Sequence, residues 1–202
     1  MAQQFRLPKV ILVEGVDDQY FFEALVGALG IPDVQVINVM GRDNLRPFIK
    51  QIPSSPGFAQ ITHLLIVRDS DTNPQGAFQS LAGALQVAQL PRPQAPDVAA
   101  PGPPAVTISL LPDSATAGDL EDLCMASVAG DPATACVTAY FQCLTQVLQQ
   151  MPSPMSKARA HAFLASRDVP HKRVGEAALM DYWPLAAPAF AGLRGIVAAA
   201  LA

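Results

Sequence analysis

Short apolar runs alternate with longer amphipathic segments through the first half of the chain. Four runs rich in Val, Ile and Leu predict strands, at residues 10–13, 34–39, 63–67 and 106–111. Runs this short, apolar without alternation, are typical of parallel strands covered on both faces. Between them lie three segments with helical spacing, at residues 17–29, from 41 onward and at 76–89. This order of elements predicts a parallel four-stranded sheet flanked by helices, in the α/β class.

The second half of the chain is helical in pattern and is preceded by a proline-rich segment. Residues 90–104 hold six of the 19 prolines, which predicts an extended surface loop. Helical patterns follow the fourth strand, at residues 119–128, 132–150, 156–166 and 185–201. We therefore expect residues 1–202 to form a single α/β domain, with a loop at 90–104 and a helical part at 119–202.

Composition limits the binding partners and the cellular compartment that can be expected for this protein. The net charge of −4 and the pI near 5.2 provide no broad basic surface, so we expect any contact with nucleic acid to be weak unless a metal or a protein partner assists it. Three cysteines without CxxC spacing argue against a disulfide framework or a zinc site. No apolar segment has the length of a membrane span or signal peptide, so we expect a cytoplasmic protein.

Acidic residues follow two of the predicted strands directly. Glu14-Gly15 comes after residues 10–13, and Asp69-Ser70-Asp71 comes after residues 63–67. The carboxyl ends of parallel strands form one edge of the sheet, where ligands bind in open α/β folds. Carboxylates gathered there need a counter-charge, and oxygen ligands favour Mg²⁺ or Mn²⁺. The alternative for each acid is an ordinary turn or helix cap, as it is for Asp17 and Asp18.

These motifs together resemble a Toprim domain, a fold with Rossmann-type layers. The resemblance extends to a Toprim-like family close to the OLD-family nucleases, through three further segments. They are the Asp17-Asp18 pair, the acidic segment of Leu111-Pro112-Asp113 and residues 118–122 (Gly-Asp-Leu-Glu-Asp), and the lysine-containing helix at residues 156–161.

The resemblance implies roles for particular residues. The expected metal ligands are Glu14, Asp69, Asp71, Asp113 and Glu121. Glu14 is also the expected general acid or base. Lys157 is the expected group that neutralises charge on a phosphate in the transition state.

A third feature is a candidate phosphate site that rests on its own residues. Gly41 and Arg42 open the second helix, where backbone N–H groups and the guanidinium would face an anion. An ordinary strand-to-helix turn explains the same residues.

Two functions remain open at this stage. The first is magnesium- or manganese-dependent phosphodiester chemistry, most directly cleavage of nucleic acid by water, because none of the three tyrosines has the context of a strand-transfer nucleophile. The second is a metal-binding Toprim module without catalysis, which acts as a regulatory partner of other proteins or of nucleic acid. The acidic pI favours the second function, and a catalytic geometry at Glu14 would favour the first.

Overall fold

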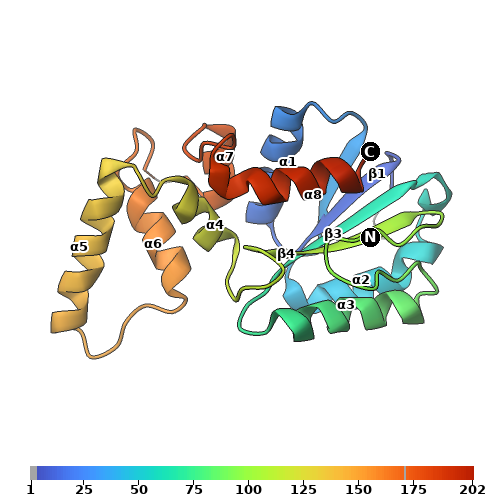
Figure 1. Cartoon of the computed structure of the whole chain (residues 1–202), viewed down its shortest axis with the longest axis horizontal. Coiled ribbons are helices and arrows are strands. Elements are labelled where there is room, and N and C mark those ends of the chain that lie inside the picture. The colour runs from blue at the N-terminus through green and yellow to red at the C-terminus, as the bar shows by residue number, and fades with distance from the viewer. Residues whose placement is uncertain (1–3, 171) are drawn as a thin grey trace.

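The computed structural model describes residues 4–170 and 172–202 and contains a four-stranded parallel sheet in the order β2-β1-β3-β4 (Figure 1). The strands are β1 (Lys9–Val13), β2 (Val34–Asn38), β3 (His63–Asp69) and β4 (Ala105–Leu111). The predicted α/β class and the parallel sheet are confirmed, and each strand agrees with its predicted range to within two residues. β3 extends two residues further than expected, so that Asp69 is its last residue rather than the second residue beyond its end.

Helices fill the connections and most of the chain after β4. They are α1 (Val16–Leu29), α2 (Arg42–Gln51), α3 (Pro74–Val87), α4 (Leu120–Ser127), α5 (Pro132–Val147), α6 (Met155–Leu164), α7 (Val174–Leu179) and α8 (Ala191–Ala200). Two expectations were wrong in detail. The short helix α7 was not predicted, and the single helix expected at residues 185–201 is a 3-10 turn at Pro188–Phe190 followed by α8.

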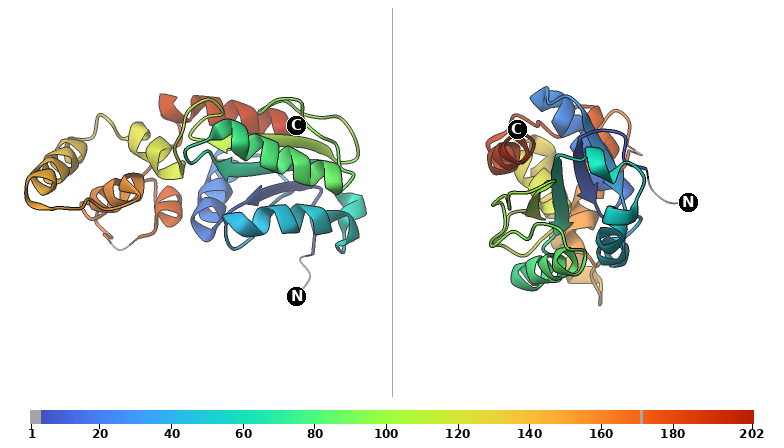
Figure 2. Two further views of the ribbon diagram at one scale, coloured as in Figure 1. Left: turned by 90° about the horizontal axis from the view of Figure 1, so that it is seen from below. Right: turned by 90° about the vertical axis from the view of Figure 1, so that its right-hand side faces the viewer.

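Helices cover both faces of the sheet, as parallel strands require. Alternate residues of β1 enter different cores: Ile11 packs in the core beneath α1, α7 and α8, whereas Leu12 packs in the core beneath α2 and α3. Figure 2 shows these three layers, with the sheet between the helices. Helices α5 and α6 extend beyond the sheet on the side of α4 (Figure 1).

The topological switch point of the sheet lies between β1 and β3, which pair in parallel with Leu12 opposite Ile66. The helix after β1 lies on one face of the sheet and the helix after β3 lies on the other. Adjacent strands that continue into opposite layers leave a crevice at their carboxyl ends, and this is the usual ligand site of open α/β sheets. The predicted acidic residues Glu14 and Asp69 lie at these two strand ends.

The strand β4 forms one edge of the sheet, and the segment before it covers that edge. The backbone N–H of Asp97 donates to Ile108, and Ala100 forms an isolated antiparallel bridge with Val106. A covered edge is protected from pairing with other chains. None of the helices in residues 4–170 and 172–202 has the length and apolar character that a bilayer crossing requires.

Candidate functional site

A pocket of about 460 Å³ lies at the carboxyl ends of β1 and β3, and we call it the carboxylate pocket. Six of the predicted site residues line it: Glu14, Gly41, Arg42, Asp69, Asp71 and Lys157. They come from four different parts of the chain, and the parallel sheet brings most of them together because its strands end at one edge.

Glu14 is the first residue after β1, and its side chain is 15% exposed. Its carboxylate oxygen Oε1 lies 3.5 Å from Nε of Arg68, whose side chain is equally buried. The two atoms are within ion-pair distance, yet within the described chain neither makes a hydrogen bond. Burial raises the pKa of Glu14 to about 7 even though Arg68 opposes the shift, and the carboxylates of Asp18 and Asp71 add to it.

Asp69 ends β3 deep in the pocket. One of its carboxylate oxygens accepts a hydrogen bond of 3.1 Å from the backbone N–H of Leu120, the first residue of α4. Burial raises the pKa of Asp69 well above its usual range, and the nearby carboxylates of Asp18, Glu14 and Glu121 raise it further. The N-terminus of α4 favours the ionised form of Asp69. Desolvation and the neighbouring acids, to which Asp119 also belongs, outweigh this effect.

Asp71 lies closer to the surface and is held by two arginines. One carboxylate oxygen is 3.0 Å from Nη1 of Arg42 and 3.5 Å from Nη2 of Arg68. Its backbone has φ of 51° and forms an antiparallel bridge with Gly118, with hydrogen bonds of 3.0 and 2.8 Å. This bridge joins the loop after β3 to the loop before α4, so the two acidic segments are fixed relative to each other.

Glu121 and Lys157 form the side of the site that α4 and α6 supply. Glu121 is 6% exposed, and its Oε1 lies 3.7 Å from Nζ of Lys157. Burial raises the pKa of Glu121 to about 7, with Asp119 adding to the shift and Lys157 opposing it. Burial lowers the pKa of Lys157, but the surrounding acids, Glu121 and Asp69 foremost, raise it by more, so the ammonium form is favoured.

The phosphate site expected at Gly41 and Arg42 is only partly available. The backbone N–H of Gly41 donates to the carbonyl oxygen of Glu14 at 2.7 Å, so it does not point at an external anion. Gly41 has φ of 123°, and its role is the sharp turn into α2. The Arg42 side chain is 52% exposed and lines the pocket, where it contacts Asp71 and Asp43.

Asp113 is not brought into the carboxylate pocket, contrary to its predicted role as a metal ligand. One of its carboxylate oxygens accepts hydrogen bonds of 2.8 and 2.7 Å from the backbone N–H groups of Ala115 and Thr116, and the other accepts one from the Thr116 hydroxyl. These bonds lower the pKa of Asp113. The residue stabilises its own turn, which is a common role for Asp in loops.

Arg68, which the sequence did not single out, belongs to the site, together with Asp119 of the predicted acidic segment. Arg68 precedes Asp69 in β3, and extension of the β1–β3 register by two residues places it beside Glu14. Asp119 caps α4 and accepts a hydrogen bond from the hydroxyl of Ser156, which ties the start of α6 to the start of α4. The predicted pairing of β1 with β3 could have placed Arg68 in the site. No feature of the sequence predicts the hydrogen bond between Asp119 and Ser156.

The donor chemistry suits a hard cation, although the side chains are not gathered around one. Carboxylate oxygens are the donors at the ends of both strands, and a buried Glu14 oxygen has no hydrogen bond within the described chain. In residues 4–170 and 172–202, no three Asp, Glu, His or Cys side chains lie close enough to enclose an ion. Arg68 contacts both Glu14 and Asp71 and provides their counter-charge.

The family is shown by a sequence profile described as "Protein of unknown function (DUF3226)", which matches residues 8–195. The chain belongs to this family. The match extends over the sheet, the carboxylate pocket and the helices up to α8. No curated protein matches the chain.

Solved structures of the C-terminal region of OLD proteins are similar to this DUF3226 protein. One from Xanthomonas campestris pv. campestris, phased with mercury, has 16% identity and a TM-score of 0.44, covering 96% of this chain and 98% of the other. One from Burkholderia pseudomallei has 14% identity and a TM-score of 0.41, covering 97% of this chain and 89% of the other.

Proposed function

We propose that this protein hydrolyses phosphodiester bonds of nucleic acid in a reaction that depends on Mg²⁺ or Mn²⁺. The observation that carries the proposal is the group of buried carboxylates at the β1–β3 crevice, Glu14, Asp69 and Glu121, whose pKa values are raised by burial and by one another. Such crowding is costly for stability and is typical of sites that bind a cation or transfer protons. The Toprim resemblance of the same residues supports this choice of chemistry.

Glu14, Asp69 and Asp71 are the residues that would hold a metal ion, with Glu121 beside them for a second. A bound divalent ion would supply charge stabilisation at the scissile phosphate and a lower pKa for an attacking water. Asp71 would have to leave Arg42 and Arg68, to which it is paired. The released Arg42, half exposed at the rim of the pocket, is then suited to contact a phosphate.

The protein's own groups fit the remaining steps of a hydrolysis. Glu14 has a pKa of about 7, so it can accept and donate a proton at neutral pH. Lys157 keeps its ammonium form and lines the pocket, with its side chain 54% exposed, so it can offset charge on a phosphate. Its ion pair with Glu121 holds the ammonium on the α4 side of the pocket.

The test is a cleavage screen on single- and double-stranded DNA and RNA, with Mg²⁺ or Mn²⁺ and with chelator. Glu14→Gln and Asp69→Asn should each lower the cleavage rate by about 100-fold or more, because each removes a carboxylate of the site. Glu23→Gln is the matched control, since Glu23 is exposed on α1. Lys157→Ala should lower the turnover rate by less and leave ion affinity unchanged. Cleavage that survives Glu14→Gln at full rate would refute the proposal.

A second candidate is a metal-binding module without catalysis, and the arginine pairs favour it. Glu14 and Asp71 already have a counter-charge within the chain, in Arg68 and Arg42. Absence of cleavage in the whole screen, together with binding of Mn²⁺ that Asp69→Asn removes, would select this function. Titration calorimetry measures that binding without any assay of activity.

A further inference from the structure

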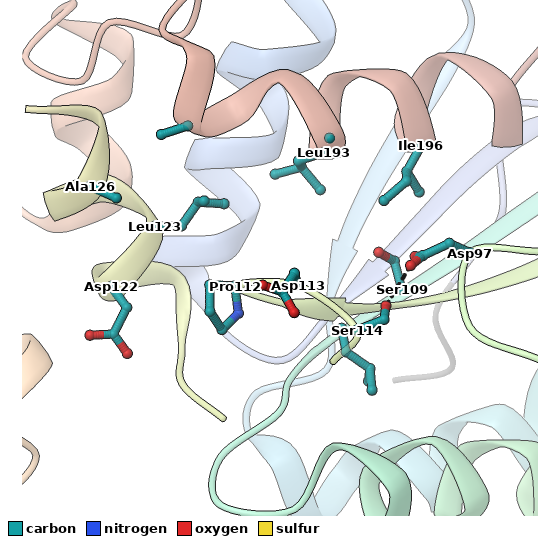
Figure 3. Close-up of a pocket in the computed structure, with 13 residues that line it drawn as sticks. Asp97, Ser109, Pro112, Asp113, Ser114, Asp122, Leu123, Ala126, Leu193 and Ile196 are labelled. Carbon is teal, nitrogen blue, oxygen red and sulfur yellow. Dashed lines mark hydrogen bonds between the residues drawn. The ribbon is translucent and has the colours of Figure 1, made fainter. Parts of the chain in front are cut away.

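A second cavity, of about 340 Å³, lies on the α8 face of the sheet (Figure 3). We call it the α8 cavity. It is bounded by β4, α4, α8 and the segments around Asp97 and Ser114. The helix α4 separates it from the carboxylate pocket: Glu121 pairs with Lys157 of that pocket, whereas Asp122 and Leu123 line the α8 cavity. A volume of this size is within the range of small-molecule sites.

Two polar groups in the α8 cavity have unmet hydrogen-bonding capacity. Ser109 is 1% exposed, and its hydroxyl makes no hydrogen bond in the part of the chain that the structure describes. The same holds for Oδ1 of Asp97, whereas the other oxygen of Asp97 accepts a hydrogen bond from the Ser114 hydroxyl. Figure 3 shows Asp97, Ser109 and Ser114 grouped together, with their oxygens close to one another. Buried polar groups without partners are costly, so they mark a place where a ligand or water donates hydrogen bonds.

The acidic residues that line the α8 cavity favour a positively charged ligand. Asp97, Asp113 and Asp122 line the cavity, and among residues 4–170 and 172–202 no lysine, arginine or histidine lines it. Asp113 is occupied by its own turn, and Asp122 accepts a hydrogen bond from the backbone N–H of Asp119. Asp97 is therefore the carboxylate with a free acceptor, and it forms no ion pair within the described residues.

The opposite wall of the cavity is apolar. Leu193 and Ile196 of α8 face the polar group across the cavity, and Leu123 of α4 lies beside them (Figure 3). An occupant that satisfies both walls has hydrogen-bond donors with positive charge at one end and an aliphatic body at the other. A metal ion or a free ammonium ion would leave the apolar wall without a partner.

We propose that the α8 cavity binds a small primary alkylamine in its ammonium form, with the ammonium group donating to Oδ1 of Asp97 and to the Ser109 hydroxyl. The alkyl chain packs on Leu193, Ile196 and Leu123. An ammonium group has three donors and no acceptor, which suits two unpaired acceptor oxygens. This site is separate from the proposed hydrolysis and does not depend on it.

The experiment is an NMR titration of the ¹⁵N-labelled protein with n-pentylamine at pH 7, where the amine is protonated. The comparison ligands are 1-pentanol and pentanoate, which keep the alkyl chain and change the head group. We expect saturable shifts at the amides of Ser109, Ser114 and Gly192. The affinity for the amine should exceed that for the alcohol by about tenfold or more, since hydrogen bonds to charged groups are the stronger kind. Pentanoate should not bind.

A matched pair of variants separates the proposed contact from general charge effects. Asp97→Asn removes the charge at a residue with φ of 61°, which Asn also adopts. Asp33→Asn makes the same change at an exposed residue with φ of 60°. Asp97→Asn should reduce the affinity for pentylamine about tenfold or more, and Asp33→Asn should leave it unchanged. If Asp97→Asn does not fold, Ile196→Trp replaces it, because the larger side chain fills the cavity.

Several results would overturn the proposal. One is equal affinity for the amine and the alcohol. Another is that the chemical shift changes concentrate at Glu14 and Asp69 instead. A third is the lack of saturable shifts, which would leave water as the partner of Ser109 and Asp97. Undiminished binding in folded Asp97→Asn or in folded Ile196→Trp would refute the contact directly.

Discussion

Burial, more than ion pairing, sets the protonation of Glu14. Its pKa is raised from 4.5 to about 7 although Arg68 is 3.5 Å away. The folded protein therefore keeps a proton on Glu14 at pH values where the unfolded chain has released it. The stabilising contribution of this proton is fully present below pH 4.5 and is lost as the pH rises through about 7.

The first prediction follows from that sign. Without divalent metal, Glu14→Gln should increase the free energy of unfolding at pH 8 by about 1–3 kcal/mol, because the amide never acquires the buried charge. The gain should shrink as the pH falls toward 5, where Glu14 is protonated in the folded protein. Urea denaturation from pH 5 to 8, in chelator, measures it. Glu23→Gln, on the exposed side of α1, is the control and should show no such trend. A gain that is equal at pH 5 and pH 8 would contradict the assigned cause.

A second prediction at this scale concerns Lys157 and Glu121. The ammonium of Lys157 opposes the rise of the Glu121 pKa, which stands at about 7. Lys157→Met keeps the length and removes the charge, so it should raise the pKa of Glu121 above 7. A ¹³C NMR titration of the glutamate side-chain carboxyl groups measures this shift. Lys50→Met, on the exposed surface of α2, should leave the Glu121 pKa unchanged. An unaltered Glu121 titration in Lys157→Met would rule out the ion pair as a determinant.

At the scale of elements, the strands were predictable and the smallest helix was not. Apolar runs bounded by Gly or Asp identify strands from local sequence, and the parallel arrangement then places Glu14 and Asp69 at one edge. The helix α7 has only six residues, and a tertiary contact holds its start: the backbone N–H of Gly175 donates to the carboxylate of Asp17 at 3.0 Å. Nothing within residues 174–179 encodes that contact.

The other differences have equally specific causes. The helix expected at residues 185–201 begins later because Pro188 cannot continue a helix and opens a 3-10 turn instead. The role of Asp113 was missed because a carboxylate before a turn serves either the turn or a ligand, and spacing alone does not distinguish them. Arg68 enters the site through the register of β1 and β3, which is a long-range property.

The third prediction tests how closely α1 and α7 approach. A Cβ atom on Gly175 would overlap the backbone of Asp17, which has no room to give. Gly175→Ala should therefore destabilise the protein by about 1–3 kcal/mol or more through overpacking. Within a helix the same substitution normally stabilises, and Gly27→Ala in α1, where a Cβ meets nothing within 4 Å, should do so by up to about 1 kcal/mol. Urea denaturation compares the two variants; a gain in stability from Gly175→Ala would refute the close approach.

At the scale of the whole molecule, the small net charge conceals a strong local imbalance. The chain carries 13 Lys and Arg against 17 Asp and Glu, which gives −4 overall. Yet Glu14, Asp69 and Asp71 share one pocket, and the basic residues that line it are Arg42 and Lys157. These carboxylates repel an approaching polyanion, and only the half-exposed Arg42 and Lys157 attract it. We therefore expect the isolated protein to bind nucleic acid weakly, with a modest dependence on salt through its few local cations.

The last prediction joins the carboxylate pocket to global stability. A divalent ion that binds only the folded state should raise the melting temperature by mass action. At 100 times its dissociation constant the gain is about 2.7 kcal/mol, or about 5–10 °C for a chain of this size. Asp69→Asn should abolish the rise, while the amide oxygen still accepts the N–H of Leu120, so the start of α4 stays in place. Asp33→Asn is the charge-matched control and should keep the rise, because Asp33 is exposed and directly precedes β2, at the end of that strand away from the pocket. An equal rise in wild type and Asp69→Asn, measured by calorimetry with Mn²⁺, would place the ion elsewhere.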